Sequence, residues 1–202
     1  MKIGISIDGV LRNFIAQFIY TYDKYINKTD IEESDVTSMN LLEFFEFKDL
    51  DSLNKFIYSE APLEIFGHAD QVSDGIVNQF NNFLLDMDYD GEHEIELVSR
   101  EVDKSIPATF FFLSKTGARP TNIRFVKTHA DEWNSLDVLI TAHPKTLAEK
   151  PSGKISVKVK TQYNNNSNSD YEIDSLSEFM LNENLRLKIL EKPIITNYEE
   201  IN

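Results

Sequence analysis

The chain has no cysteine. It therefore contains no disulfide bridge, thiol nucleophile, cysteine-ligated zinc or iron–sulfur cluster. Long apolar runs are also absent, and the stretch from Ala108 to Leu113 is far shorter than the ~20 residues that span a bilayer. No apolar leader with a cleavage site follows Met1 and Lys2. We therefore expect an intracellular protein without a membrane partner.

Basic residues are scarce. The chain has 20 lysines and arginines but 34 aspartates and glutamates, so its net charge is −14. Such a surface repels the phosphate backbone of nucleic acids, so we expect no nucleic-acid partner. Hydrophobic residues make up 41% of the 202 positions, which is enough for a folded core. The length favours one domain with a sizeable insertion.

The first 26 residues have the pattern of a strand, a tight turn and a helix. Ile3, Ile5 and Ile7 form a near-continuous apolar run, which Asp8 and Gly9 end. Over residues 11–26 the apolar side chains recur at helical spacing, at Leu11, Phe14, Ile15, Phe18, Ile19, Tyr22 and Ile26. This order is typical of the start of an α/β fold.

The rest of the chain continues the alternation. Further strands are predicted over 94–98, 122–126, 136–141 and 155–159, and helices over 74–87, 106–115 and 175–190. The pattern predicts an α/β fold with a mainly parallel five-stranded sheet and helices on both faces. Residues 1–26 and 71–192 would form the core domain, 27–70 a small helical insertion, and 193–202 a C-terminal tail.

The segment from Gly4 to Phe14, GISIDGVLRNF, resembles the first motif of haloacid-dehalogenase-like (HAD) phosphatases, above all the 5′(3′)-deoxyribonucleotidase branch. There Asp-x-Asp-Gly-Val-Leu is followed by a polar pair and Phe. Ser99 matches the second-motif Ser/Thr, residues 137–140 match the strand before the fourth motif, and 162–164 resemble a later Pro-Tyr-Asn-like stretch. The resemblance covers about residues 1–165. It implies a helical cap at 27–70 and a first strand lying between the second and fourth.

The resemblance also implies a chemistry that this chain only partly matches. In the family a first-motif Asp forms an aspartyl-phosphate, and the Asp two positions later exchanges a proton. A Lys and the Ser/Thr stabilise the phosphoryl oxygens, and fourth-motif acids complete a Mg²⁺ site. Here Ser6 stands at the nucleophile position and Asp8 is kept. Thr141 and Ala142 stand where two acids are expected, and Lys127 is the nearest basic residue to the Lys position, out of register.

These departures predict a catalytically degenerate site, with vestigial positions at Ser6, Asp8, Ser99, Lys127, Thr141 and Ala142. No cofactor is expected; an active enzyme would need Mg²⁺, with Asp8 as its one carboxylate ligand. Asp8 and Ser99 have a structural alternative, because both residue types cap turns and helices. We expect Ser6, Asp8, Ser99 and Thr141 to converge at one end of the sheet without a bound metal.

Two histidines, His129 and His143, follow predicted strands. A histidine pair at strand ends suggests a replaced metal site. No third ligand stands at a suitable spacing, so we interpret both as loop histidines.

Two functions follow from this sequence. The first is that of a binding or structural component of a larger protein assembly. Such a protein would be cytoplasmic, or virion-associated if the chain is phage-encoded, and the resemblance is compatible with a phage origin. Candidate partner-binding residues are apolar side chains of the insertion and the tail, namely Phe44, Phe45, Phe47, Ile194, Ile195, Tyr198 and Ile201. The aromatic residues of 41–47 have an alternative role as the insertion's contact with the sheet domain. The second function is an active Mg²⁺-dependent phosphatase or 5′-nucleotidase with an altered site, acting on a small phosphoester.

Overall fold

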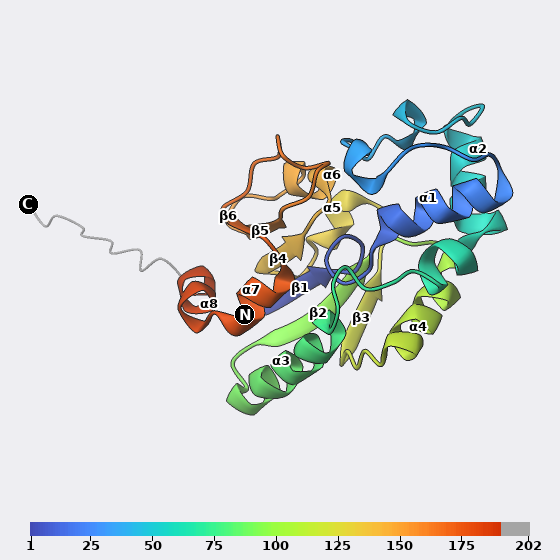
Figure 1. Cartoon of the computed structure of the whole chain (residues 1–202). Helices are drawn as coiled ribbons and strands as arrows, with labels where there is room; N and C mark the ends of the chain where they lie inside the picture. Colours follow the sequence, from blue (N-terminus) through green and yellow to red (C-terminus); the bar gives the residue numbers. More distant parts are fainter. Residues whose placement is uncertain (191–202) are drawn as a thin grey trace, which may run out of the picture.

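A six-stranded parallel sheet forms the centre of the computed structural model (Figure 1), which describes residues 1–190 except for the side chains of 88–90. The strand order is β3-β2-β1-β4-β5-β6. The strands are β1 (Lys2–Ser6), β2 (Glu94–Ser99), β3 (Asn122–Phe125), β4 (Val138–Thr141), β5 (Ile155–Val159) and β6 (Tyr171–Ile173). The predicted parallel sheet, with β1 between β2 and β4, is confirmed.

The predicted count of five strands is wrong, because β6 extends the sheet beyond β5. Three residues are too few to show an alternating pattern in the sequence. The strand is anchored by a side chain instead. The carboxylate of Asp170 accepts hydrogen bonds from the backbone N and Oγ of Ser156, at 2.7 and 2.8 Å. A contact between residues 14 positions apart therefore sets the edge of the sheet.

The helices of the core are α1 (Phe14–Tyr25), α3 (Ile76–Asp90), α4 (Ser105–Thr116), α5 (His129–Glu132), α6 (Pro144–Ala148), α7 (Leu176–Leu181) and α8 (Glu183–Leu190). Helices α1, α3 and α4 follow the predicted ranges with small shifts, whereas the short helices α5 and α6 were not predicted. Helix α1 begins at Phe14 rather than Leu11, because the Asn13 side chain accepts a hydrogen bond from the Ala16 N–H and caps it. The single helix predicted over 175–190 is wrong, since Asn182 separates α7 from α8.

The insertion consists of short helical pieces packed on α1 (Figure 1). They are η1 (Glu33–Asp35), η2 (Leu41–Glu43), α2 (Leu50–Lys55) and two single π-helical turns, η3 (Phe56–Glu60) and η4 (Leu63–Gly67). The Phe45 ring packs edge-on against Phe18 of α1, with 4.9 Å between ring centroids. The insertion thus shares one apolar cluster with α1. The predicted domain boundaries stay a prediction.

The two faces of β1 have different neighbours, because successive side chains of a strand point to opposite faces. Ile3 and Ile5 are fully buried in the main core cluster, which includes residues of α3 and α7. Gly4 faces Leu136 and Leu139, and a Cβ at Gly4 would lie 2.3 Å from a Leu136 methyl group. Ser6, two residues later, lies on the Gly4 side and so faces α5 and its surroundings. None of the helices within residues 1–190 has the length and apolarity that crossing a membrane requires.

Candidate functional site

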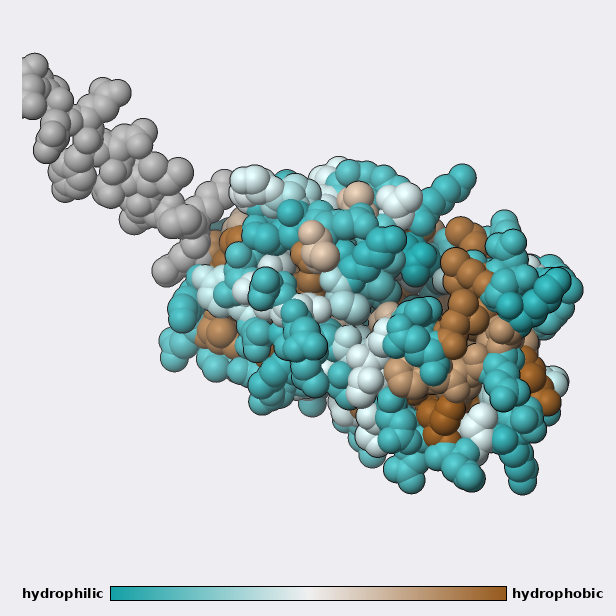
Figure 2. Space-filling view, turned by 90° about the horizontal axis from the view of Figure 1, so that it is seen from above, coloured by the Kyte–Doolittle hydropathy of each residue, from teal (hydrophilic) through white to brown (hydrophobic). Residues whose placement is uncertain are grey.

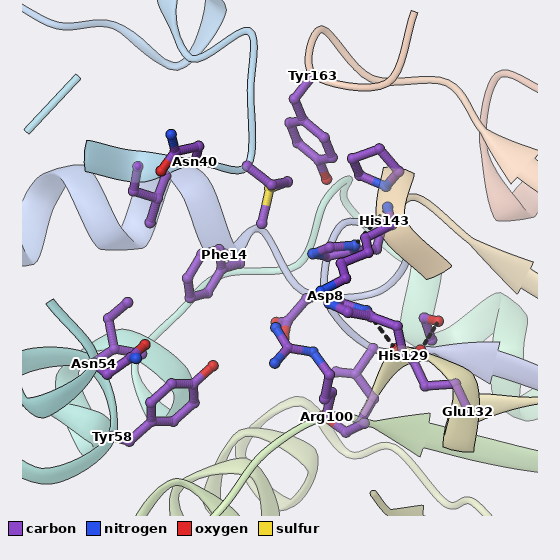
Figure 3. A pocket seen from close by; sticks show the side chains of 18 of the residues that line it. Asp8, Phe14, Asn40, Asn54, Tyr58, Arg100, His129, Glu132, His143 and Tyr163 are labelled. Carbon is purple, nitrogen blue, oxygen red and sulfur yellow. Dashed lines mark hydrogen bonds and ion pairs between the residues drawn. The ribbon is translucent and has the colours of Figure 1, made fainter. Parts of the chain in front are cut away.

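A cavity of about 710 Å³ lies at the carboxyl ends of β1 and β2, between the sheet and the insertion (Figure 3). Ligands of open parallel sheets bind at this edge. Ser6, Asp8 and Ser99, three positions of the resemblance, line the cavity. Arg100, His129, Glu132, His143, Tyr58 and Tyr163 line it as well.

Ser6 closes β1 and is 6% exposed. Its Oγ donates a hydrogen bond to Oε2 of Glu132, at 3.4 Å. The other oxygen of Glu132 accepts a hydrogen bond from Thr146 Oγ1 at 2.8 Å and lies 3.2 Å from His129 Nδ1. The Ser6 hydroxyl is therefore joined to a buried carboxylate whose orientation other side chains hold.

Asp8 follows β1 in a tight turn and is paired with Arg12. Oδ1 of Asp8 accepts a hydrogen bond from Arg12 Nε at 2.6 Å. The Arg12 side chain is fully buried. Burial disfavours its charge, but the carboxylates of Asp8 and Glu101 raise the pKa of Arg12 above its usual value. The pair therefore keeps Asp8 beside a permanent cation.

Ser99 ends β2 and is connected to the same arginine through Glu101. Its Oγ donates a hydrogen bond to Oε1 of Glu101 at 2.8 Å, and Arg12 Nη2 donates to the same oxygen. Thr109 donates to the second oxygen of Glu101. Burial raises the pKa of Glu101, and Arg12 opposes that shift. The Ser99 hydroxyl is thus engaged inside the protein.

The other three predicted vestigial positions, Thr141, Ala142 and Lys127, do not line the cavity. Thr141 closes β4 at the same end of the sheet and is fully buried. Ala142 is also buried, close to Gly9. Lys127 is exposed beyond β3. The structure therefore brings Ser6, Asp8 and Ser99 together without these three residues.

The residues present do not fit a Mg²⁺ site of the kind that the resemblance implies. One oxygen of Asp8 is occupied by Arg12. Thr141 and Ala142 supply no carboxylate. No group of three His, Asp or Glu side chains within the described part of the chain is arranged to hold a metal ion. We therefore derive no chemical step through a metal.

The two histidines meet at the cavity, with 4.1 Å between ring centroids. His129 begins α5, and Nδ1 of His143 accepts a hydrogen bond from the Lys145 N–H at the start of α6. Burial, together with the charges of His129, Arg100 and Lys145, lowers the pKa of His143 to about 2. The interpretation as loop histidines is therefore wrong for His129, which is helical and buried.

Two tyrosines face the cavity from opposite sides (Figure 3). Tyr58 comes from η3 of the insertion, and Tyr163 follows β5. Burial raises the pKa of both hydroxyl groups, and the Arg100 guanidinium opposes the shift at Tyr58. Both hydroxyls are therefore neutral hydrogen-bonding groups at neutral pH.

Sequence reasoning missed Arg12, Arg100, Glu101 and Glu132. A signal existed for Arg12, a lone charge between the apolar residues Leu11 and Phe14. Arg100 and Glu101 directly follow Ser99 at a strand end, where ligand-binding side chains are expected. Nothing in the local pattern pairs Ser6 with Glu132, which is 126 positions away.

The predicted partner-binding residues fall into two groups. Phe45 is 3% exposed and belongs to the apolar cluster of α1, whereas Phe44 and Phe47 are half-buried beside it. These contacts match the alternative role, packing of the insertion on the core. Ile194, Ile195, Tyr198 and Ile201 lie outside the described residues.

No protein-family model and no curated protein sequence matches this chain. Solved structures do match, among them the crystal structure of a dehalogenase with an intermediate complex, at a TM-score of 0.52. The match covers 88% of this chain and 94% of the dehalogenase, at 10% sequence identity. At such low identity the similarity concerns the fold alone. The chain therefore has an α/β fold with a six-stranded parallel sheet, similar to the fold of this dehalogenase.

Proposed function

We propose that this chain is a catalytically degenerate HAD-fold protein that acts by binding rather than by hydrolysing phosphoesters. One observation carries the proposal. The three cavity residues at predicted vestigial positions are each engaged by a partner inside the protein: Ser6 by Glu132, Asp8 by Arg12, and Ser99 by Glu101. None of the three is left as a free group for a phosphoryl transfer.

The chemistry of these residues supports the same conclusion. An aspartyl-phosphate needs a carboxylate at the position of Ser6, and a serine hydroxyl cannot form one. Oδ1 of Asp8 is held by Arg12 Nε at 2.6 Å, so this oxygen points at a side chain of the protein rather than at a ligand. Ser99 donates its hydroxyl hydrogen to Glu101 rather than into the cavity.

The test is an assay for hydrolysis of p-nitrophenyl phosphate and a panel of deoxynucleoside monophosphates, with and without Mg²⁺. We expect no turnover above that of Asp8→Asn. Asp86→Asn is the matched control, because Asp86 is exposed on α3 and far from the lining of the cavity. Turnover that Asp8→Asn abolishes and Asp86→Asn retains would contradict the proposal.

One observation favours the second candidate, an active phosphatase with an altered site. The carboxylate of Glu132 is the acceptor of the Ser6 hydroxyl, and a carboxylate in this position is able to take a proton from a nucleophile. This candidate requires turnover that is lost in both Ser6→Ala and Glu132→Gln. Turnover that depends on Glu132 but persists in Asp8→Asn would identify this altered chemistry.

We further propose a role as a component of a protein assembly, with a phage particle as one such assembly. Exposed apolar side chains support a protein partner. Leu63 of η4 is 48% exposed and Phe111 of α4 is 42% exposed, and they are neighbours at Gly67. Seen from above, apolar side chains gather on the side of the molecule that carries the insertion (Figure 2). The tail deletion described in the Discussion tests this role.

A further inference from the structure

The carboxylates around the cavity have partners inside the protein, whereas one cation of the lining has no ion-pair partner in the part of the chain that the structure describes. Asp8 and Glu101 share Arg12, and Glu132 is bonded to Thr146, Ser6 and His129. Arg100 is half-buried in the lining and forms no ion pair with any described residue. Its guanidinium interacts with the Tyr58 hydroxyl, which is neutral. Arg100 is therefore a cation with spare donors that faces the cavity (Figure 3).

The surroundings of Arg100 favour a ligand with a single negative charge. The other cation of the lining, Lys145, has a 65% exposed side chain, so water screens its charge. The carboxylates of Asp8 and Glu132 line the same cavity and disfavour a second negative charge nearby. A planar guanidinium binds a carboxylate through two parallel hydrogen bonds.

The insertion supplies an apolar and aromatic wall. The rings of Phe14 and Phe66 stack at 5.7 Å, and Tyr58 stacks on Phe66 at 5.8 Å. Leu41, Leu50, Leu53 and Ile57 continue the wall. A ring that lies against this wall from the cavity gains apolar burial and stacking. The volume of about 710 Å³ is within the range of cavities that hold drug-sized molecules.

We propose that the cavity binds a small aromatic carboxylate, whose carboxylate group lies at Arg100 and whose ring lies against Phe14, Tyr58 and Phe66. The proposal rests on the proposed binding function and gives it a ligand class. It also predicts which kind of anion the cavity prefers. A planar monoanion binds better here than a phosphate dianion of the same aromatic body.

Three probes with one ring system test this choice by isothermal titration calorimetry at a fixed salt concentration. 2-Naphthoate carries one negative charge, 2-naphthamide none, and 2-naphthyl phosphate two near neutral pH. We expect 2-naphthoate to bind about tenfold more tightly than either of the others, the range of a charge-assisted hydrogen bond. Absence of saturable 2-naphthoate binding, or tighter binding of the amide or the phosphate, overturns the proposal.

Arg100→Gln tests the position of the carboxylate group. We expect a loss of about tenfold in 2-naphthoate affinity and little change for 2-naphthamide. Arg119→Gln is the matched control, because Arg119 is exposed and does not line the cavity. Equal affinities for 2-naphthoate in the two variants overturn the proposal.

A second pair of variants tests the position of the ring. This test remains valid even if the Arg100→Gln variant does not fold. Leu50 lines the cavity and is 56% exposed, whereas Leu63 is 48% exposed and does not line it. Leu50→Gln should weaken binding of 2-naphthoate and 2-naphthamide alike, and Leu63→Gln should weaken neither. Binding that is insensitive to Leu50→Gln overturns the ring position.

The same reagents separate this inference from the proposed function. Release of fluorescent 2-naphthol from 2-naphthyl phosphate would contradict the proposed function and leave the 2-naphthoate titration intact. Failure of 2-naphthoate to bind would overturn this inference and leave the absence of hydrolysis unaffected.

Discussion

Arg12 Nε donates to Oδ1 of Asp8 across 2.6 Å, while Nη2 at the other end of the same guanidinium donates to Glu101. The arginine is fully buried, and these two carboxylates are its ion-pair partners. Through Glu101 the network also reaches the hydroxyl of Ser99. Asp8, one of the residues that resemble a catalytic site, therefore also helps to neutralise a buried charge.

We predict that Arg12→Met lowers the free energy of unfolding by about 3–5 kcal/mol, because Glu101 is left buried without its cation. Denaturant unfolding at neutral pH measures the change. In the double variant Arg12→Met/Glu101→Met the stranded charge is also removed, so part of the loss should be recovered. A double variant less stable than the single one would contradict this account.

The control for this series is Lys55→Ala, which removes an ion pair with Glu60 between two exposed side chains. Water screens such a pair, so unfolding should be nearly unchanged.

Gly9→Ala should destabilise the protein more than Gly153→Ala. Both glycines have a left-handed backbone, with φ of +73° and +77°. A Cβ at Gly153 meets open space, whereas one at Gly9 would lie 2.3 Å from the Tyr163 hydroxyl oxygen and 2.8 Å from Ala142 Cβ. The backbone strain, about 1–2 kcal/mol, is common to both variants. Chemical denaturation of the two variants isolates the clash at Gly9; equal losses would show that Tyr163 moves aside without cost.

The half-buried imidazole of His143 should make stability fall with acid. Its folded pKa of about 2 is far below the unfolded value, so below pH 6.5 the unfolded chain takes up a proton that the folded protein does not. Stability from this group is complete above pH 6.5 and decreases as the pH falls below it. Between pH 7 and 5 the loss is about 2 kcal/mol.

Unfolding of wild type and His143→Gln at pH 7 and 5 measures this term. The variant should lose less stability over that interval than the wild type does. His68→Gln, at an exposed position, should keep the wild-type dependence. Identical pH dependence in all three proteins would contradict the burial of a neutral His143.

Deletion of residues 193–202 tests the assembly role predicted from the sequence. We expect a melting temperature close to that of the full chain and weaker association with partner chains, measured by analytical ultracentrifugation of the native assembly. A large fall in melting temperature with association intact would show that the tail belongs to the protein's own fold.

The sequence alone determined the α/β class and the clustering of Ser6, Asp8 and Ser99, while the central place of β1 was implied by the family resemblance. Apolar periodicity is a local property, and the ends of parallel strands meet at one edge by topology. Prediction from the sequence failed at β6, which is only three residues long. It also failed at Asn182, because the apolar residues keep their helical spacing although the helix is interrupted there.

Only the tertiary structure decided what these residues do. Arg12 meets Glu101 from 89 positions away, and Ser6 meets Glu132 from 126 positions away. Each pairing depends on how β1 packs beside β2 and beneath α5, which no window of sequence contains. The charge state of a buried group depends on its neighbours in space, so the family motif indicated where the cavity lies but not that its side chains are already paired.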